Sequence, residues 1–122
     1  MIDRDHPIVD LREADLTGTF LIRADLSNAN LSGAFLTDSY LTATILVRAN
    51  LRFAVLYDAT LSLVNFSRAD LTGADLRGAE VTEEQLANCI SLEAATMPDG
   101  QKYEDWRKTR PEFKLKEEPG SP

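Results

Sequence analysis

The chain has 122 residues, with 20 acidic against 13 basic side chains, a formal net charge of −7 and a pI near 4.6. This length is that of a single domain, and the acidic balance argues against nucleic acid or an anionic membrane as a partner. No stretch approaches the ~20 apolar residues of a membrane span, and residues 1–7 are too polar for a signal peptide. We therefore expect a cytoplasmic protein, and the periplasm or an organellar lumen stays open if a targeting segment has been removed.

Large apolar residues recur with a period of five. Fourteen slots, from Leu11 to Leu76, hold thirteen leucines and one phenylalanine, Phe66. Successive members lie about 140° apart on an α-helix and on opposite faces of a strand, so neither element buries them together. A chain that turns a corner every five residues keeps this slot inward at each turn. A fixed internal period is typical of a solenoid.

A second slot, two positions before each leucine, holds mainly small residues. Large and small side chains alternating in a narrow interior satisfy close packing, whereas the remaining slots carry polar residues typical of a solvated exterior. The small slot contains Val9, Ala14, Thr19, Ala24, Ala29, Ala34, Ser39, Thr44, Ala49, Ala54, Ala59, Val64, Ala69, Ala74 and Ala79.

These units resemble those of the pentapeptide-repeat family, in which Ala-(Asp/Asn)-Leu is followed by two mostly polar residues, and in style they are similar to its small cyanobacterial members. The resemblance runs over residues 9–81. It implies an all-β fold, a right-handed quadrilateral parallel β-helix with four pentapeptides in each of about four coils. The twenty-residue coil agrees with one column of the sequence, where Asp10, Asn30, Asn50 and Asp70 are all Asp or Asn.

Four segments follow from where the repeat begins and ends. Residues 1–8 form a thin N-terminal cap, and residues 9–81 form the β-helix. Residues 82–100 contain a capping helix and a partial last coil, and residues 101–122 form a partly disordered tail. The start of the third segment, Thr82 with Gln85 three residues on, predicts a capping box that opens a helix over residues 83–89.

The same helix is expected to turn Leu86 and Ile90 onto the last coil. After it, Leu92, Ala95 and Met97 repeat the inward pattern shifted by one register position. In the tail, residues 101–108 predict a short helix packed back on the coil through Tyr103, Trp106 and Phe113, and residues 114–122 are expected to be disordered.

No arrangement of residues supports catalysis or metal binding. His6 is the one histidine and stands before the first repeat, so neither a metal site nor a Ser-His-Asp triad can be assembled. Cys89, the one cysteine, is expected to be a small buried residue. Carboxylates such as Asp15, Asp25, Asp70 and Asp75 are interpreted as outward polar members of the repeat. We expect a protein that is not an enzyme and has no cofactor.

Large apolar residues occupy several outward slots of the middle repeats, where the family usually has polar ones. Phe20 and Tyr40 are expected on one side of the coil, with Phe35 and Val55 on the adjacent side. Such a cluster marks either a site for a partner or a surface that the C-terminal tail covers. The candidate interaction patch comprises Phe20, Phe35, Tyr40, Ile45, Phe53, Val55 and Tyr57.

The function predicted from these features is presentation of a rigid surface to another protein. The alternative is an acidic mimic of duplex DNA that binds a type II topoisomerase, DNA gyrase, as the resemblance implies for the quinolone-resistance members. About four coils and several outward arginines weaken that alternative. The short N-terminal leader leaves two oligomeric states open: a monomer, or a dimer formed through the end of the coil.

Overall fold

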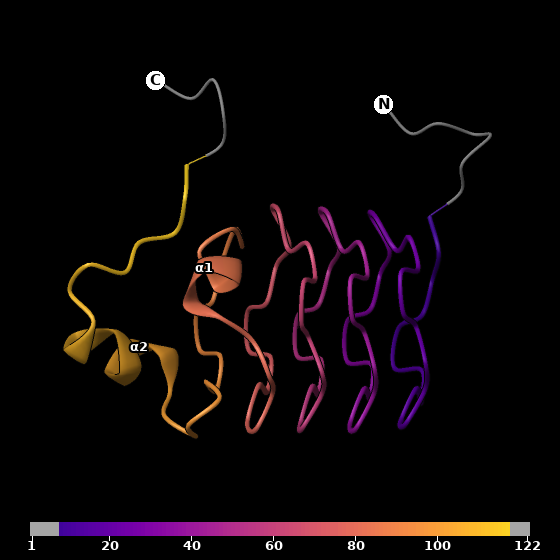
Figure 1. The fold of residues 1–122 in the computed structure, drawn as a ribbon, viewed down its shortest axis with the longest axis horizontal. Helices are drawn as coiled ribbons and strands as arrows, with labels where there is room; N and C mark the ends of the chain where they lie inside the picture. Colours follow the sequence, from indigo (N-terminus) through magenta and orange to yellow (C-terminus); the bar gives the residue numbers. More distant parts are fainter. Residues whose placement is uncertain (1–7, 118–122) are drawn as a thin grey trace.

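The computed structural model describes residues 8–117, and most of them form one stack of backbone turns (Figure 1). Parallel bridges join each turn to the next at a spacing of twenty residues, as in Asp10 with Asn30 and Asn30 with Asn50. The bridges fall into four columns, one for each side of the turn. The predicted twenty-residue coil is therefore confirmed, and four turns separate Asp10 from Ser91, the last member of its column.

Backbone hydrogen bonds between the turns hold the stack together. On one side of one turn, Leu31 N donates to Asn50 O at 2.7 Å and Asn50 N donates to Ala29 O at 2.9 Å. A further bond closes each corner within the turn, as from Ala34 N to Leu31 O at 3.0 Å. Because the polar groups of the backbone are paired between turns, the core can be apolar without leaving buried donors unsatisfied.

Each corner needs one residue with positive φ. The slot two positions after leucine supplies it in every repeat from Glu13 to Gly78, with φ of 67–69° at its glycines and 56–63° at the other residues. Glycine, as at Gly33 and Gly73, adopts this conformation without steric cost. The same slot also holds Phe53 and Leu63, for which the left-handed conformation is unfavourable.

The leucine slot forms the core as predicted. Every member from Leu31 to Leu76, Phe66 included, is fully buried, and the small slot fills the space between them. At the N-terminal end Leu11, Leu16 and Leu21 are only partly buried, because no described turn lies in front of them. For the same reason Val9, predicted to point inward, is exposed.

Helix α1 (Glu83–Leu86) replaces one side of the last full turn (Figure 1). Its capping box is confirmed: Gln85 N donates to Thr82 Oγ1 at 3.1 Å, and Thr82 N donates to Gln85 Oε1 at 2.9 Å. The amide of Gln85 also donates to the carbonyls of Leu61 (2.7 Å) and Val64 (3.2 Å). The side chain of Gln85 thus makes the hydrogen bonds to the preceding turn that the backbone makes elsewhere in the coil.

The helix is shorter than the predicted span of residues 83–89, because coil pairing resumes early. Arg68 N donates to Asn88 O at 2.8 Å, and Ile90 N donates to Ala69 O at 2.8 Å. Cys89 therefore takes the small inward slot and is fully buried. The prediction that Ile90 points inward was wrong: this residue takes the next, outward slot and is 48% exposed.

Gln85 allows a test of how the insertion is held. Gln85→Glu is expected to lower the free energy of unfolding by about 1–3 kcal/mol, since a carboxylate cannot donate to the two carbonyls. Urea denaturation measures this. Glu84→Gln, an exposed change on the same helix, is expected to stay within about 0.5 kcal/mol. Equal loss in both variants would mean that Gln85 does not anchor α1.

The shifted register of the last coil is also confirmed. Asp70 pairs with Ser91 and Asp75 with Thr96, a spacing of 21 instead of 20 residues, and Leu92, Ala95 and Met97 are fully buried. The chain then turns, and Thr96 pairs with Lys102 in an antiparallel bridge.

The C-terminal segment closes this end of the stack (Figure 1). It contains helix α2 (Tyr103–Trp106) and the 3₁₀ helix η1 (Arg107–Thr109). Three aromatic residues, Tyr103, Trp106 and Phe113, are buried against the core, as predicted from the sequence. Residues 114–117 continue the described chain, with a bond from Lys116 N to Ala87 O at 2.7 Å, whereas the remainder of the predicted disordered stretch lies outside the described residues.

Candidate functional site

Phe20 and Tyr40 form an exposed aromatic stack on one side of the coil. They belong to one bridge column, and their rings lie 4.7 Å apart and 5° from parallel. Phe20 is 73% exposed and Tyr40 43%. The two residues therefore share one side of the coil, as expected from the twenty-residue spacing.

A second group lies on the adjacent side. Phe35 and Val55 pair in one column, and Tyr57 follows two residues after Val55. Phe53 occupies the corner before this side, where its ring lies directly over Gly73. Cations cover part of this group, because Arg52 lies 5.7 Å from the centre of the Phe53 ring and Arg77 lies 5.4 Å from that of Tyr57.

Ile45 lies on a third side of the coil. It pairs with Asp25 and Asn65, on the side of the coil that follows the aromatic stack. The seven residues of the predicted patch therefore belong to three successive sides of the coil and to the corners beside them. Of them, the Phe20–Tyr40 stack is the most exposed aromatic pair.

The described part of the C-terminal tail, residues 101–117, does not cover the aromatic stack. Trp106 packs edge-on against Phe113 with ring centres 5.0 Å apart, and Tyr103 contacts both rings. These residues are buried at the C-terminal end of the core, whereas Phe20 belongs to the first turn. The hypothesis that Trp106 or Phe113 shields the patch was wrong, because both rings are instead buried against the core at the open end of the last coil.

The outward carboxylates have a local role that the sequence reading did not identify. The Asp or Asn before leucine accepts the backbone N–H two residues on, as from Ser27 N to Asp25 Oδ1 (3.0 Å) and from Thr72 N to Asp70 Oδ1 (2.9 Å). Such a bond caps the turn. The regular Asx–Leu–x spacing is the signal from which this role could have been deduced.

These hydrogen bonds also affect ionisation. The guanidinium of Arg77 holds the pKa of Asp75 below its ordinary value. Burial raises the pKa of Asp70, but bonds from Thr72 and from Arg52 outweigh it and the net pKa is lowered. Carboxylates that are ionised and already engaged in turns are not arranged as a general acid and base, so the local chemistry matches a structural role.

No group of described residues is arranged to hold a metal ion, and His6 lies outside residues 8–117. Burial raises the pKa of the Cys89 thiol to about 12, so the thiol stays protonated at neutral pH and is a poor nucleophile. Within the described range, no helix is long and apolar enough to cross a membrane.

One hollow of the surface has no signal in the sequence. It lies beside α1 and is lined by Leu63, Val81 and two glutamates, Glu80 and Glu84. Leu63 is not a member of the predicted patch. The hollow forms where α1 interrupts the repeat, and no periodic pattern indicates it.

Comparison with known proteins places the chain in a family. A family model described as pentapeptide repeats matches residues 9–42 and 44–82, in eight copies. None of the curated proteins compared with the chain matches it.

Several solved structures of repeat proteins are similar. One is a pentapeptide repeat protein of the Arabidopsis thaliana thylakoid lumen (26% identity over 92% of this chain and 82% of that chain, TM-score 0.44). Another is Rfr23 of the cyanobacterium Cyanothece 51142 (29% identity, 77% and 63%, TM-score 0.39). A third is HetL of Nostoc sp. strain PCC 7120 (25% identity, 77% and 64%, TM-score 0.32). The chain spans less than two thirds of the latter two. Because the family model covers more than half of the chain and its repeats coincide with the observed turns, the chain belongs to the pentapeptide-repeat family.

Proposed function

We propose that this protein is not an enzyme and that it presents a rigid side of its coil to another protein. The observation that carries the proposal is the exposed Phe20–Tyr40 stack, with rings 4.7 Å apart and no described segment over it. Aromatic residues are enriched at protein interfaces because they bury a large area at low entropic cost.

Phe20 and Tyr40 stand in the slot where other repeats have an Asp or Asn that caps the turn. At the equivalent position of other repeats, Asp25 and Asn30 accept a backbone N–H, a bond that Phe20 and Tyr40 cannot make with their rings. Ring stacking contributes about 0.5–1.5 kcal/mol and so compensates in part, but it leaves most of Phe20 in water. The exposure that remains fits a surface kept for a partner.

The scaffold favours binding because it is already ordered. Tyr40 N donates to Thr19 O (2.9 Å) and Leu21 N donates to Tyr40 O (2.8 Å), so the pair lies on backbone that is held by the neighbouring turns. Little conformational entropy is then lost when a partner docks, which improves affinity for a given contact area.

The proposal can be tested by affinity capture from a lysate of the source organism. We expect a protein that binds the wild type to be lost on Phe20→Ser with Tyr40→Ser, while the melting temperature changes by only a few degrees. The matched control is Phe35→Ser with Val55→Ser on the adjacent side, which should retain the same protein. Identical capture by all three would contradict the proposal.

The alternative of a DNA mimic predicts gyrase subunits in the same capture. A mimic needs carboxylates arranged like phosphates and free to attract a basic groove. Here Asp10 pairs with Arg12 at 2.8 Å and Asp75 with Arg77 at 2.8 Å, which neutralises part of the acidic surface. We therefore favour the aromatic side as the binding surface. The right-handed winding implied by the family resemblance remains part of the proposal.

The N-terminal end bears on the oligomeric state. Its partly buried leucines offer apolar surface to a second copy, but Asp15 and Asp25 belong to the same first turn and would face the same carboxylates of that copy. Charged rims of this kind oppose edge-to-edge association. We propose a monomer at neutral pH, and light scattering that gives the mass of a dimer would contradict it.

A further inference from the structure

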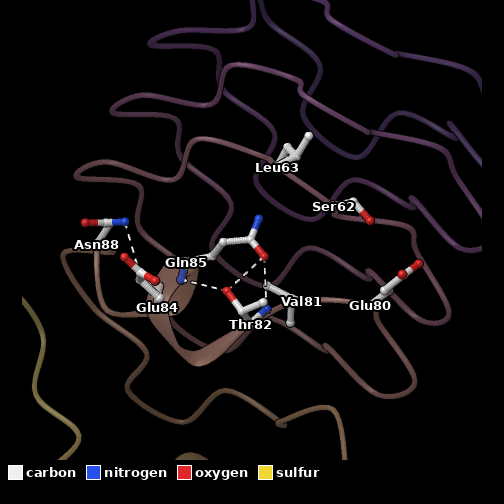
Figure 2. A pocket seen from close by; sticks show the side chains of 8 residues that line it. All are labelled: Ser62, Leu63, Glu80, Val81, Thr82, Glu84, Gln85 and Asn88. Atoms are coloured by element: carbon white, nitrogen blue, oxygen red, sulfur yellow. Dashed lines mark hydrogen bonds between the residues drawn. The ribbon is translucent and has the colours of Figure 1, made fainter.

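A hollow of about 490 Å³ lies where α1 joins the coil. Figure 2 shows Leu63 and Ser62 on the side of the preceding turn, with Val81 and Gln85 opposite them and the two glutamates at either side. Apolar surface dominates its lining.

The hollow exists because α1 interrupts a column of corners. Arg23, Ala43 and Leu63 stand in this column with φ near 60°, one in each successive turn. In the next turn Thr82 caps α1 instead, so no corner residue stacks on Leu63. The side chain is left 79% exposed.

Leu63 contributes little to its own fold. It combines an apolar side chain in water with a backbone conformation that is unfavourable for leucine. Phe53, in the same slot at another corner, differs because its ring covers Gly73 and lies 5.7 Å from the Arg52 guanidinium. Contacts within the chain therefore account for the side chain of Phe53 but not for that of Leu63. Leu63 is the more exposed apolar residue of the hollow.

The charges at the hollow are of one sign. Glu80 and Glu84 are exposed, neither takes part in an ion pair of the described structure, and no basic residue lines the hollow. The side-chain amide of Gln85 already donates to the carbonyls of Leu61 and Val64, and its side-chain carbonyl accepts the N–H of Thr82. The two carboxylates are thus the charged groups that a ligand would meet.

We propose that this hollow binds a segment of another protein in which an aliphatic side chain lies beside lysine or arginine. The aliphatic side chain packs on Leu63 and Val81, and a cation on each side of it pairs with Glu80 or with Glu84. Charge complementarity favours a basic occupant, because an uncharged apolar segment would leave both carboxylates without a partner. The chain itself has this pattern at Lys114, Leu115 and Lys116, but there Leu115 packs against its own core and Lys116 N donates to Ala87 O at 2.7 Å, so we assign the occupant to another protein. The site is separate from the Phe20–Tyr40 stack.

An NMR titration tests the proposal with the capped peptide acetyl-Lys-Leu-Lys-amide. Saturable shifts are expected at the backbone amides of Leu63, Val81 and Glu84, and they should weaken as salt is added. The peptides acetyl-Glu-Leu-Glu-amide and acetyl-Lys-Ser-Lys-amide are expected to cause no such shifts, because each lacks one of the two features.

Variants separate the two parts of the site. Glu80→Gln with Glu84→Gln is expected to weaken binding about fivefold, as for the loss of two exposed ion pairs. Leu63→Ser is expected to abolish it, whereas Phe53→Ser, at the equivalent corner slot, should leave it unchanged. The melting temperature of each variant confirms that it is folded.

Three results would overturn the proposal: no saturable shift at millimolar peptide, equal binding of the acidic peptide, or shifts at these residues that depend on protein concentration without peptide. The last would indicate a second copy as the occupant. Phe20→Ser with Tyr40→Ser should bind the basic peptide normally, so failure of the hollow and failure of the aromatic side can be distinguished.

Discussion

Leu46→Asp is expected to abolish the cooperative melting of the protein. Leu46 is fully buried in the middle of the stack. Truncating a buried leucine costs about 2–5 kcal/mol, and an unpaired buried carboxylate adds several kcal/mol more. Together these terms approach the whole stability of a typical domain, about 5–15 kcal/mol. Circular dichroism during a thermal ramp measures the result.

The matched control is Asn65→Asp on the next turn. Asn65 O accepts the N–H of Leu46 at 2.9 Å, so the two substitutions lie next to each other, but the Asn65 side chain points outward and is exposed. Its oxygen accepts a bond from Ser67 N at 3.0 Å, which an aspartate preserves. We expect a melting temperature close to that of the wild type. Similar melting of both variants would mean that the assigned inward slot is incorrect.

Trp106→Ala is expected to produce the second largest loss, about 3–5 kcal/mol. Its ring is almost fully buried, lies edge-on to Phe113 at 5.0 Å and stacks under the guanidinium of Arg110 at 4.2 Å. Removing it leaves a cavity over the last coil. At roughly 4 °C per kcal/mol the melting temperature should fall by roughly 10–20 °C.

Lys108→Ala serves as the control for this segment. Lys108 forms an exposed ion pair with Asp105 at 3.0 Å, and such pairs contribute little to stability, so the melting temperature should hardly change. Calorimetry distinguishes the two variants. If Trp106→Ala also melted like the wild type, the C-terminal segment would not close the coil.

The local repeat was readable from the sequence because it recurs at every turn. A leucine that must point inward every five residues admits few backbone paths, and the positions of Gly33 and Gly73 mark the corners where φ is positive. The capping box was equally local, since Thr82 and Gln85 are three residues apart. The one-residue shift at Leu92 followed from the same pattern once the repeat resumed.

Where the repeat stops, neighbouring turns decided the outcome. The end of α1 and the choice between Cys89 and Ile90 for the inward slot depend on hydrogen bonds to Arg68 and Ala69, which lie one turn earlier in the coil. The sequence near α1 favours helix, but pairing with the turn below satisfies more backbone groups, and the coil resumes at Asn88.

Thus the amino-acid sequence by itself determined the coil, its inward slots and the apolar residues on its outside, because these depend on the period alone. Only the tertiary structure decided which outward residues stay exposed. The tail packs Trp106 and Phe113 onto the open last coil, where both rings are buried, and Phe20 and Tyr40 stay exposed. The hollow at Leu63 likewise arises from two segments, a corner and a helix, whose contact no local pattern encodes.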